Sequence, residues 1–386
     1  MIRYQLPVHS PLTAAAVWSA VRGGEPAGAL ETLVAERFGA ERVALVDSGT
    51  TALALALRLA VPDGGPVALP AYACYNLATA ADAAPHRVLL YDVDLRTLGP
   101  DESSVERVLR AGARAVVVAP LYGMPVAMDG ISARCRASGV ALIEDAAQHA
   151  GARWNGKPVG GFGDLSVISF GRGKGVTAGR GGALLARGAR WVTAVAEAEG
   201  GVGAARGWLG DVAKLKAQWL FARPSLYVVP ASLPFLGLGE TVYHRPWPAE
   251  GMSRAARGAL GETWGGEGAE VAGRRRNAAR LLDALRRSTR GFTPVPPVAG
   301  GEPGYLRLPV RAAGPVVAGI ERARRLGVMP GYPKALVDLP GFGERVANRG
   351  EAFPGARALV RELITLPTHS LLGEADLARL EAWMLR

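Results

Sequence analysis

Short apolar runs alternate with stretches of helical periodicity along residues 40–186. Seven runs that are apolar at almost every position predict β-strands: RVALV (42–46), GPVALP (65–70), HRVLLYDV (86–93), ARAVVVAP (113–120), VALIED (140–145), DLSVISF (164–170) and GGALLA (181–186). The stretches between them predict helices over 51–60 and near 76–84, 101–112 and 128–138. Strands that are apolar on both faces need cover on both faces. The pattern therefore indicates an α/β fold with a mostly parallel sheet between helices.

The strand pattern is lost after residue 186. Residues 187–290 show helical periodicity, with an aromatic, proline-interrupted patch from Trp208 to Trp247 that fits a lid, a membrane-surface element or, most commonly, an interface or core. From Gly291 onward, YLRLPVR and ELITLP predict strands of a smaller α+β unit that the helix EADLARLEAWML closes. We expect an N-terminal arm over 1–24, a large domain over 25–250 and a small domain over 251–386.

Composition narrows the class of protein. Hydrophobic residues make up 49% of the 386 positions, as in a soluble globular protein. Two cysteines cannot build a disulfide framework, and free thiols fit a reducing cytoplasm. The start MIRYQLPVHSPL lacks the apolar core of a signal peptide, and no apolar stretch is long enough to span a membrane. The net charge of +11 is spread along the chain, which disfavours a nucleic-acid-binding arm.

Lysine is scarce in this chain. Lysine and arginine together number 45, of which only five are lysines; these are Lys157, Lys174, Lys214, Lys216 and Lys334. Arginine can replace lysine as a surface charge but not in imine chemistry, because a guanidinium does not lose its proton in proteins. Lys174, which lies in a glycine-rich loop, is therefore a candidate for a role that requires an amine.

Two motifs follow predicted strands, where ligands of parallel sheets bind. Asp47-Ser48-Gly49-Thr50-Thr51 lies between a strand and a helix, where exposed backbone N–H groups at the positive end of the helix dipole form a phosphate cradle. The alternative is that Ser48 is an ordinary helix cap. Asp145 ends the strand VALIED, where a buried carboxylate needs a partner: in a pyridoxal phosphate (PLP) site such an acid holds the pyridine nitrogen protonated, and the alternative is that Asp145 caps the next turn.

The third motif is the run Ser166 to Gly175, followed by Gly181-Gly182. A Walker A loop needs glycine at position 168, which is isoleucine, and a dinucleotide fingerprint starting at Gly171 needs glycine or alanine at position 176, which is valine. What remains is a strand, a flexible loop and one amine, with Ser169 and the loop amides available to bind phosphate.

The ordered set SGTTAL, EDAAQ and SFGRGKG…GRGG resembles the DegT/DnrJ/StrS family of PLP-dependent sugar aminotransferases. The resemblance extends to LETLVAERFGAERVALVDSGTTAL, to RRRNAARLLDAL and to ELITLPTHSLLGEADLARL, so only about 195–250 lies outside it. It implies the aspartate-aminotransferase fold (fold type I), with a seven-stranded sheet in the large domain and a smaller C-terminal α+β domain. The residues Gly171-Arg172-Gly173 before the lysine, and Gly175 after it, differ from the family's usual pattern.

The resemblance also implies the roles of single residues. Lys174 would carry PLP as a Schiff base, Asp145 would pair with the pyridine nitrogen, and Gln148 would contact the ring's phenolic oxygen. Gly49, Thr50 and Ser169 would bind the phosphate. Tyr72 or Tyr75 would stack on the ring, and Asn277 would reach the cofactor phosphate of the other subunit in a homodimer. No metal ligand is expected.

The activity that the resemblance implies is the transfer of an amino group from L-glutamate or glutamine to a keto sugar. The sugar is expected to be nucleotide-linked and to serve surface polysaccharide or secondary-metabolite biosynthesis. Freed from the cofactor, the Lys174 amine would be the general base. Two alternatives stay open: a PLP enzyme of this fold with another acceptor or reaction, and a non-catalytic interaction or nucleic-acid-binding protein.

Overall fold

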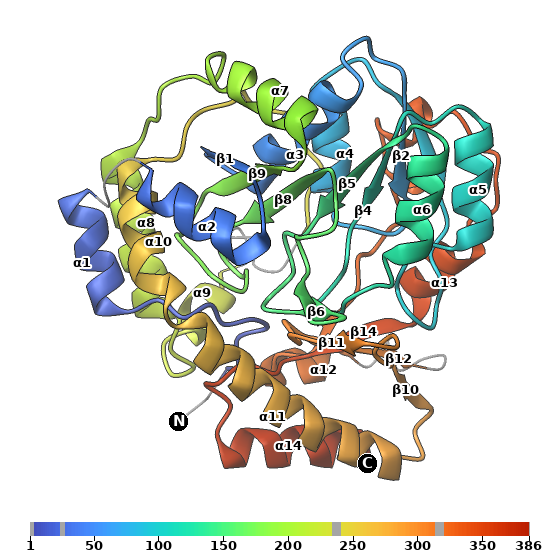
Figure 1. The fold of residues 1–386 in the computed structure, drawn as a ribbon. Helices are drawn as coiled ribbons and strands as arrows, with labels where there is room; N and C mark the ends of the chain where they lie inside the picture. The colour runs from blue at the N-terminus through green and yellow to red at the C-terminus, as the bar shows by residue number, and fades with distance from the viewer. Residues whose placement is uncertain (1–3, 24–27, 234–240, 313–319, 386) are drawn as a thin grey trace.

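A computed structural model describes residues 4–23, 28–233, 241–312 and 320–385. Its central sheet has seven strands in the order β1-β9-β8-β5-β4-β2-β3 (Figure 1). The strands are β1 (Arg42–Val46), β2 (Pro66–Pro70), β3 (Arg87–Tyr91), β4 (Ala115–Val118), β5 (Ala141–Asp145), β8 (Leu165–Ser169) and β9 (Gly182–Ala186). β9 alone runs antiparallel to its neighbours β1 and β8. The predicted mostly parallel, seven-stranded sheet is confirmed.

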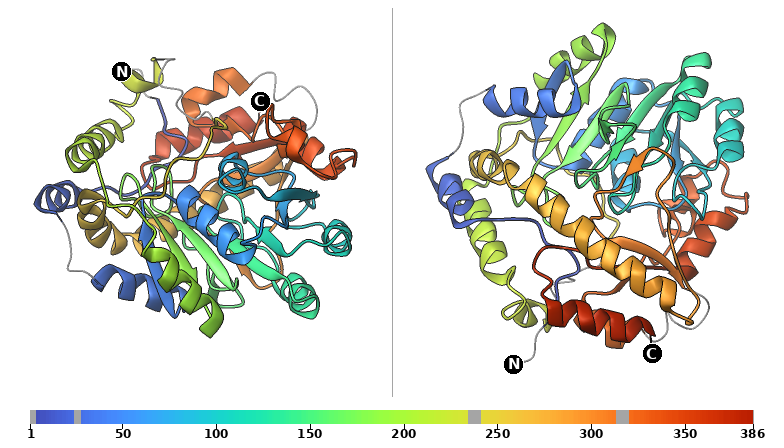
Figure 2. Two further views of the ribbon diagram at one scale, coloured as in Figure 1. Left: turned by 90° about the horizontal axis from the view of Figure 1, so that it is seen from above. Right: turned by 60° about the horizontal axis from the view of Figure 1, so that its bottom comes forward.

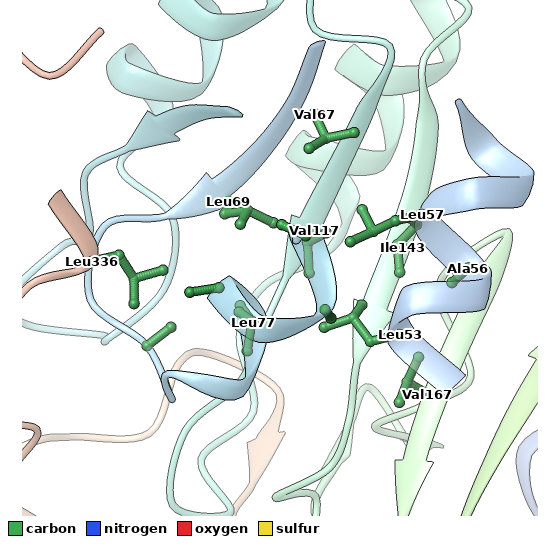
Figure 3. Packing of buried hydrophobic residues seen from close by; sticks show 14 of the residues in the cluster. Leu53, Ala56, Leu57, Val67, Leu69, Leu77, Val117, Ile143, Val167 and Leu336 are labelled. Atoms are coloured by element: carbon green, nitrogen blue, oxygen red, sulfur yellow. The ribbon is translucent and has the colours of Figure 1, made fainter. Parts of the chain in front are cut away.

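Helices cover both faces of this sheet. Alternate residues of β2 show why both faces are apolar: Val67 and Leu69 pack with α3 (Gly49–Ala60) and α4 (Asn76–Ala81), whereas Ala68 packs with α5 (Glu102–Arg110) and α6 (Asp129–Ala137). Figure 3 shows α3 on the sheet, with Leu53 and Leu57 facing the central strands. Each leucine buried in this way contributes roughly 2 kcal/mol relative to an exposed one. This burial fixes the start of α3 at the carboxyl edge of the sheet.

The middle of the chain is helical, as predicted, in the part that the structure describes. Its helices are α7 (Ala189–Glu199), α8 (Trp208–Phe221), α9 (Val228–Ala231), α10 (Arg254–Trp264) and α11 (Glu267–Arg287). α10 packs in one apolar core with α1 (Ala14–Arg22) and α2 (Ala29–Phe38). In α8, Leu215 is buried in that core while Leu209 is 72% exposed. The aromatic patch is thus partly core, and its residues 234–240 lie outside the described residues.

The smaller C-terminal unit contains an antiparallel sheet in the order β10-β12-β14-β13. Its elements, apart from α11, are β10 (Phe292–Pro294), β12 (Leu308–Ala312), α12 (Ile320–Ala323), β13 (Met329–Pro330), α13 (Pro354–Glu362), β14 (Leu363–Leu366) and α14 (Glu374–Leu385), with short 3₁₀ turns at Arg324–Leu326, Leu336–Asp338 and Gly343–Arg345. α11 and α14 lie side by side beneath the sheet (Figure 2). The expected strands and closing helix are confirmed, and the domain limits 1–24, 25–250 and 251–386 stay a prediction.

A third, three-stranded sheet connects the two units. In it, β6 (Arg153–Trp154) pairs with β7 (Lys157–Pro158) and with β11 (Gly301–Glu302), which comes from the C-terminal part of the chain. Among the described residues, no helix combines the length and apolar character that a membrane crossing requires.

Candidate active site

A cavity opens at the carboxyl ends of β4, β5 and β8. Its wall consists of strand ends, the first turns of α3 and α4, and the loops that follow β4, β5 and β8. The residues are Gly49, Thr50, Leu53, Cys74, Asn76, Leu77, Ala119, Pro120, Leu121, Asp145, Ala147, Gln148, Ser169 and Lys174. Six of the predicted site residues therefore meet in one cavity, at the edge of the sheet where ligands bind: Gly49, Thr50, Asp145, Gln148, Ser169 and Lys174.

Asp145 is the carboxylate of the cavity. It is 8% exposed, and its Oδ1 accepts a hydrogen bond of 3.1 Å from the backbone N–H of Ala147. Burial raises the pKa of this carboxyl above its ordinary value, while the charge of Lys174 acts in the opposite direction. Deprotonated Asp145 is therefore costly in the free protein, and a cation bound beside it lowers that cost.

The neighbouring Glu144 faces away from the cavity and has a structural role. Its Oε1 accepts from the Gly160 N–H at 2.7 Å, and its Oε2 accepts from the N–H groups of Phe162 and Gly163 at 2.7 and 3.2 Å. Successive residues of a strand point to opposite faces, so only one of the two acids at the end of β5 reaches the cavity.

The start of α3 has the geometry of an anion cradle. Ser48 caps the helix, because its Oγ accepts from the Thr51 N–H at 3.1 Å. The alternative interpretation of Ser48 is thus correct, and it is compatible with a cradle at the next two residues. A Cβ on Gly49 would lie 2.8 Å from the Cβ of Ser169, and a Cβ on Gly182 would lie 2.5 Å from the nitrogen of Gly49. Gly49, Ser169 and Gly182 thus pack too closely for a side chain at either glycine, and the first amides of α3 have no partner within the helix.

The loop that carries Lys174 connects β8 to β9. Gly173 has a φ of +77°, and a Cβ on Gly175 would lie 2.5 Å from the Cα of Ala150. Both positions therefore require glycine. The Thr177 hydroxyl donates to the carbonyls of Phe170 and Gly171 at 3.3 and 3.2 Å, which closes the loop at its base.

Both polar ends of the Gln148 side chain are fixed. Its Oε1 accepts from the backbone N–H of Tyr122 at 2.9 Å, and its Nε2 donates to the hydroxyl of Tyr332 at 2.7 Å. Tyr122 holds a φ of +57°, which is rare for a residue with a bulky side chain. Tyr332 follows β13, so the C-terminal unit orients a residue of the cavity wall.

The two candidate stacking residues do not line the cavity. Tyr72 and Tyr75 are 1% and 4% exposed, and their rings lie 5.5 and 6.1 Å from the ring of Tyr332. The cavity wall at this point is formed by Cys74 and Asn76. Burial raises the pKa of the Cys74 thiol, against the charge of Lys174. The stacking role of either tyrosine stays a prediction that this cavity wall does not support.

Asn277 lies on α11, outside the cavity wall. Its amide nitrogen donates to the carbonyls of Thr368 and His369, both at 2.9 Å. Its expected contact with the cofactor of a second subunit stays a prediction. Sequence reasoning missed Cys74, Asn76 and Tyr332. The first two lie inside the segment PAYACYNL, where attention went to the aromatic residues, and no local pattern marks Tyr332.

Residues 12–197 match the sequence profile of the DegT/DnrJ/EryC1/StrS aminotransferase family. This part of the chain is similar to that family. It contains Lys174, Asp145 and the α3 cradle, so the predicted family is confirmed over the segment that builds the cavity. The relatives named next match this chain over less than half of their own length.

The names of these relatives refer to different compounds. The chain is 33% identical to 3-amino-5-hydroxybenzoate synthase of Amycolatopsis mediterranei over 42% of each chain. It is 35% identical to the UDP-N-acetyl-3-dehydro-alpha-D-glucosamine 3-aminotransferase of Acidithiobacillus ferrooxidans over 46% of each chain. GDP-perosamine synthase of Caulobacter vibrioides is 34% identical over 40% of this chain and 42% of its own.

Solved structures share the whole fold. The aminotransferase TlmJ of Streptoalloteichus hindustanus superposes with a TM-score of 0.78 at 24% identity, over 98% of this chain and 97% of its own. Helicobacter pylori PseC, an aminotransferase of pseudoaminic acid biosynthesis, superposes with a TM-score of 0.79 at 14% identity, over 99% of this chain and 98% of its own. The expected fold is thus confirmed along the chain, including the C-terminal unit that the family profile does not reach.

Proposed function

We propose that this chain is a PLP-dependent aminotransferase that moves an amino group from L-glutamate or glutamine to a keto sugar linked to a nucleotide. The observation that carries the proposal is the single cavity in which Lys174, Asp145 and the start of α3 meet. An amine, a buried acid and a set of open amides match the aldehyde, the pyridine nitrogen and the phosphate of PLP. The named activities of the family relatives support the same reaction.

When bound, PLP supplies an electrophilic carbon for amines and a ring that accepts electrons. In the proposed site, Lys174 provides the amine that holds the cofactor covalently. Once released, the same amine takes and returns a proton at the reacting carbon of the substrate. Asp145 keeps the proton on the ring nitrogen, because a buried carboxylate gains most from a cation beside it.

The remaining wall residues bind and orient. The amides of Gly49 and Thr50 and the Ser169 hydroxyl donate to the phosphate, as helix N-termini do for anions. Gln148 has its side chain fixed by Tyr122 and Tyr332, so it presents its remaining amide N–H in one orientation toward the ring's phenolic oxygen. We place the enzyme in the cytoplasm, which its two free thiols support.

Visible absorption tests the cofactor assignment. Protein purified in the presence of PLP should show a band from the lysine-bound cofactor, and the band should disappear in Lys174→Ala. Lys214→Ala, which removes an exposed lysine of α8, is the matched control and should keep the band. L-glutamate should bleach the wild-type band and release 2-oxoglutarate. A band that is unchanged in Lys174→Ala would contradict the proposal.

A second candidate function keeps the cofactor and changes the acceptor. The relative from Amycolatopsis mediterranei is named as a synthase of an aminohydroxybenzoate, which is no sugar. A panel of nucleotide-linked keto sugars and cyclic ketones, offered to the enzyme after one round with glutamate, decides between the two. Amination of the ketones alone would favour the second function.

We further propose that two copies form a dimer in which Asn277 of each completes the other's site. In the single chain this amide nitrogen already donates to the carbonyls of Thr368 and His369, so the proposal requires it to give up one of these partners. Sedimentation of the PLP-bound enzyme tests the dimer. A dimer that binds PLP equally well in Asn277→Ala would overturn the role of the side chain.

A further inference from the structure

The tip of the lysine loop is rich in glycine. Gly171, Gly173 and Gly175 alternate with Arg172 and Lys174, and glycine restricts the backbone less than any other residue. Thr177 closes the base of the loop but bonds no atom at its tip. The backbone of Lys174 therefore depends on a contact from elsewhere in the chain.

Besides the packing of Gly175 against Ala150, a hydrogen bond to this backbone comes from Ser10. Its hydroxyl donates a hydrogen bond of 2.5 Å to the backbone carbonyl of Lys174, across 164 positions of sequence. Ser10 is 5% exposed, so water competes little for its hydroxyl. A hydrogen bond to this carbonyl fixes the peptide plane that follows Lys174, and with it the direction in which the side chain leaves the backbone.

The segment that carries Ser10 is itself held in place. The Gln5 N–H donates to the Arg325 carbonyl at 3.0 Å, and His369 Nε2 donates to the Leu6 carbonyl at 2.9 Å. Farther along, the guanidinium groups of Arg307 and Arg274 donate to the carbonyls of Pro7 and His9.

The donors to this segment are rigid. Arg307 and Arg274 are 5% and 0% exposed, and Arg307 also donates to both oxygens of Thr365 and to the Gly327 carbonyl. The carbonyl of each residue from Leu6 to His9, apart from Val8, is thus bonded to the C-terminal unit or to α11. Ser10 meets the lysine loop from a fixed position.

We propose that Ser10 is a positioning residue for the cofactor lysine: through the Lys174 carbonyl it orders the tip of the glycine loop and aims the Lys174 amine into the cavity. This inference rests on the proposed function, because it assigns Ser10 a task toward the PLP amine. It also explains how a loop of alternating glycines can present one amine, since the N-terminal segment adds order at the loop's tip to the bonds that Thr177 makes at its base.

The test compares Ser10→Ala and Ser10→Thr with Ser288→Ala. Ser288 donates to the Met384 carbonyl at 2.6 Å and joins α11 to α14, so it is a hydroxyl-to-carbonyl bond of the same kind away from the cavity. Titration of each apo-protein with PLP should give a dissociation constant about three- to tenfold higher in Ser10→Ala, as expected for one lost hydrogen bond. Ser10→Thr and Ser288→Ala should bind like the wild type.

Two further measurements distinguish positioning from general destabilisation. Hydrogen exchange in the apo-protein should become faster at 171–176 in Ser10→Ala and stay unchanged there in Ser288→Ala. The pH at which the visible band changes should also shift in Ser10→Ala alone, because the amine of the lysine-bound cofactor changes its surroundings. Ser10→Ala that matches Ser288→Ala in all three measurements would overturn the inference. If Ser10→Ala does not fold, Ser10→Thr decides the question: wild-type values support the inference and a loss of PLP binding overturns it.

A separate experiment on the wild type tests the proposed function itself. Borohydride reduction of the wild type with PLP, followed by peptide mapping, should place the cofactor on Lys174. Absence of that adduct in the wild type rejects the proposed function, whereas its presence together with an indifferent Ser10→Ala rejects only the role of Ser10.

Discussion

The amide nitrogen of Gln148 donates a hydrogen bond of 2.7 Å to the hydroxyl of Tyr332. The two residues belong to different parts of the chain, one just after β5 and the other just after β13. The Tyr332 N–H in turn donates to the Tyr72 hydroxyl at 2.8 Å, so the contact lies inside a packed cluster of tyrosines. The orientation of a cavity residue thus depends on the C-terminal unit.

Tyr332→Phe should weaken PLP binding by about three- to tenfold while leaving the fold intact, because it removes one hydrogen bond and frees the Gln148 amide to rotate. Titration of the apo-protein measures the change. Tyr91→Phe is the matched control, since the buried Tyr91 hydroxyl donates to the Val117 carbonyl at 2.6 Å on the opposite face of the sheet. The control should lower the melting temperature and bind PLP normally. Equal PLP binding by both variants would contradict the role of Tyr332.

Gly49→Ala should reduce PLP binding by about tenfold or more, because its Cβ would lie 2.8 Å from the Cβ of Ser169 and distort the cradle. Gly268→Ala serves as control. It changes a glycine in the first turn of α11 whose added Cβ meets no atom within 4 Å. The control should stabilise the protein by about 0.5–1 kcal/mol, as alanine does in exposed helix positions. Denaturant unfolding and PLP titration give both quantities.

Asp145→Asn should raise the stability of the apo-protein and weaken its binding of PLP. Burial raises the pKa of Asp145 above its ordinary 3.8, so the ionised form is less favourable in the folded apo-protein than in the unfolded chain. The contribution of Asp145 to the free energy of unfolding is fully present below pH 3.8, and it is lost as the pH rises through the pKa that this carboxyl has in the folded protein.

At neutral pH, therefore, Asp145→Asn apo-protein should require more denaturant to unfold than the wild type, and the difference should fade as the pH falls toward 3.8. PLP binding should fall by about ten- to hundredfold, as expected for the loss of a charged hydrogen bond. An apo-protein that is less stable than the wild type at pH 7 would contradict the assigned cost of the buried carboxylate.

Two buried histidines should make the fold sensitive to mild acid. Burial lowers the pKa of His149 from 6.5 to about 4, and it lowers the pKa of His369 to about 3. Both are neutral in the folded protein at a pH where the unfolded chain takes up protons. Their contribution to the free energy of unfolding is fully present above pH 6.5, and it is lost as the pH falls from 6.5 toward the folded-state pKa values of about 4 and 3.

The free energy of unfolding of the apo-protein should accordingly decrease by up to about 1.4 kcal/mol per histidine for each pH unit in that window. Denaturant titrations at pH 7.5, 6 and 5 measure the slope. His149→Asn keeps an acceptor for the Gly151 N–H, which Nδ1 accepts at 3.0 Å in the wild type, and should show a smaller slope. If the free energy of unfolding of the wild type is constant from pH 7.5 to 5, the buried histidines do not make the fold sensitive to acid.

Most of the large domain could be predicted because its strands are apolar at nearly every position. Val67 and Leu69 pack on one face of β2 and Ala68 on the other, which is the burial that such a run requires. The same argument placed Asp145, Ser169 and Gly49 at one edge, since the carboxyl ends of neighbouring parallel strands meet there. Motifs that directly follow strands are accordingly visible in the sequence.

Contacts from distant segments could not be predicted in this way. Tyr332 and Ser10 reach the site through hydrogen bonds of single side chains, and such contacts leave no periodic pattern around them. The stacking residue shows a further limit: the family resemblance implied Tyr72 or Tyr75, whereas the turn of the chain brings Cys74 to the cavity wall. Which of three neighbouring side chains faces a ligand depends on backbone geometry that periodicity does not specify.

The order of strands in the small sheet has a consequence for the synthesis of the protein. β14 lies between β12 and β13, and its Thr365 accepts from Arg307, which also holds Pro7. Residues 363–366 must therefore be synthesised before the N-terminal segment can bind at its position in the fold. The large domain can form during translation, but the loop around Lys174 gains its support from Ser10 only when the chain is almost complete. On the proposed function, firm binding of the cofactor would then follow the completion of the chain.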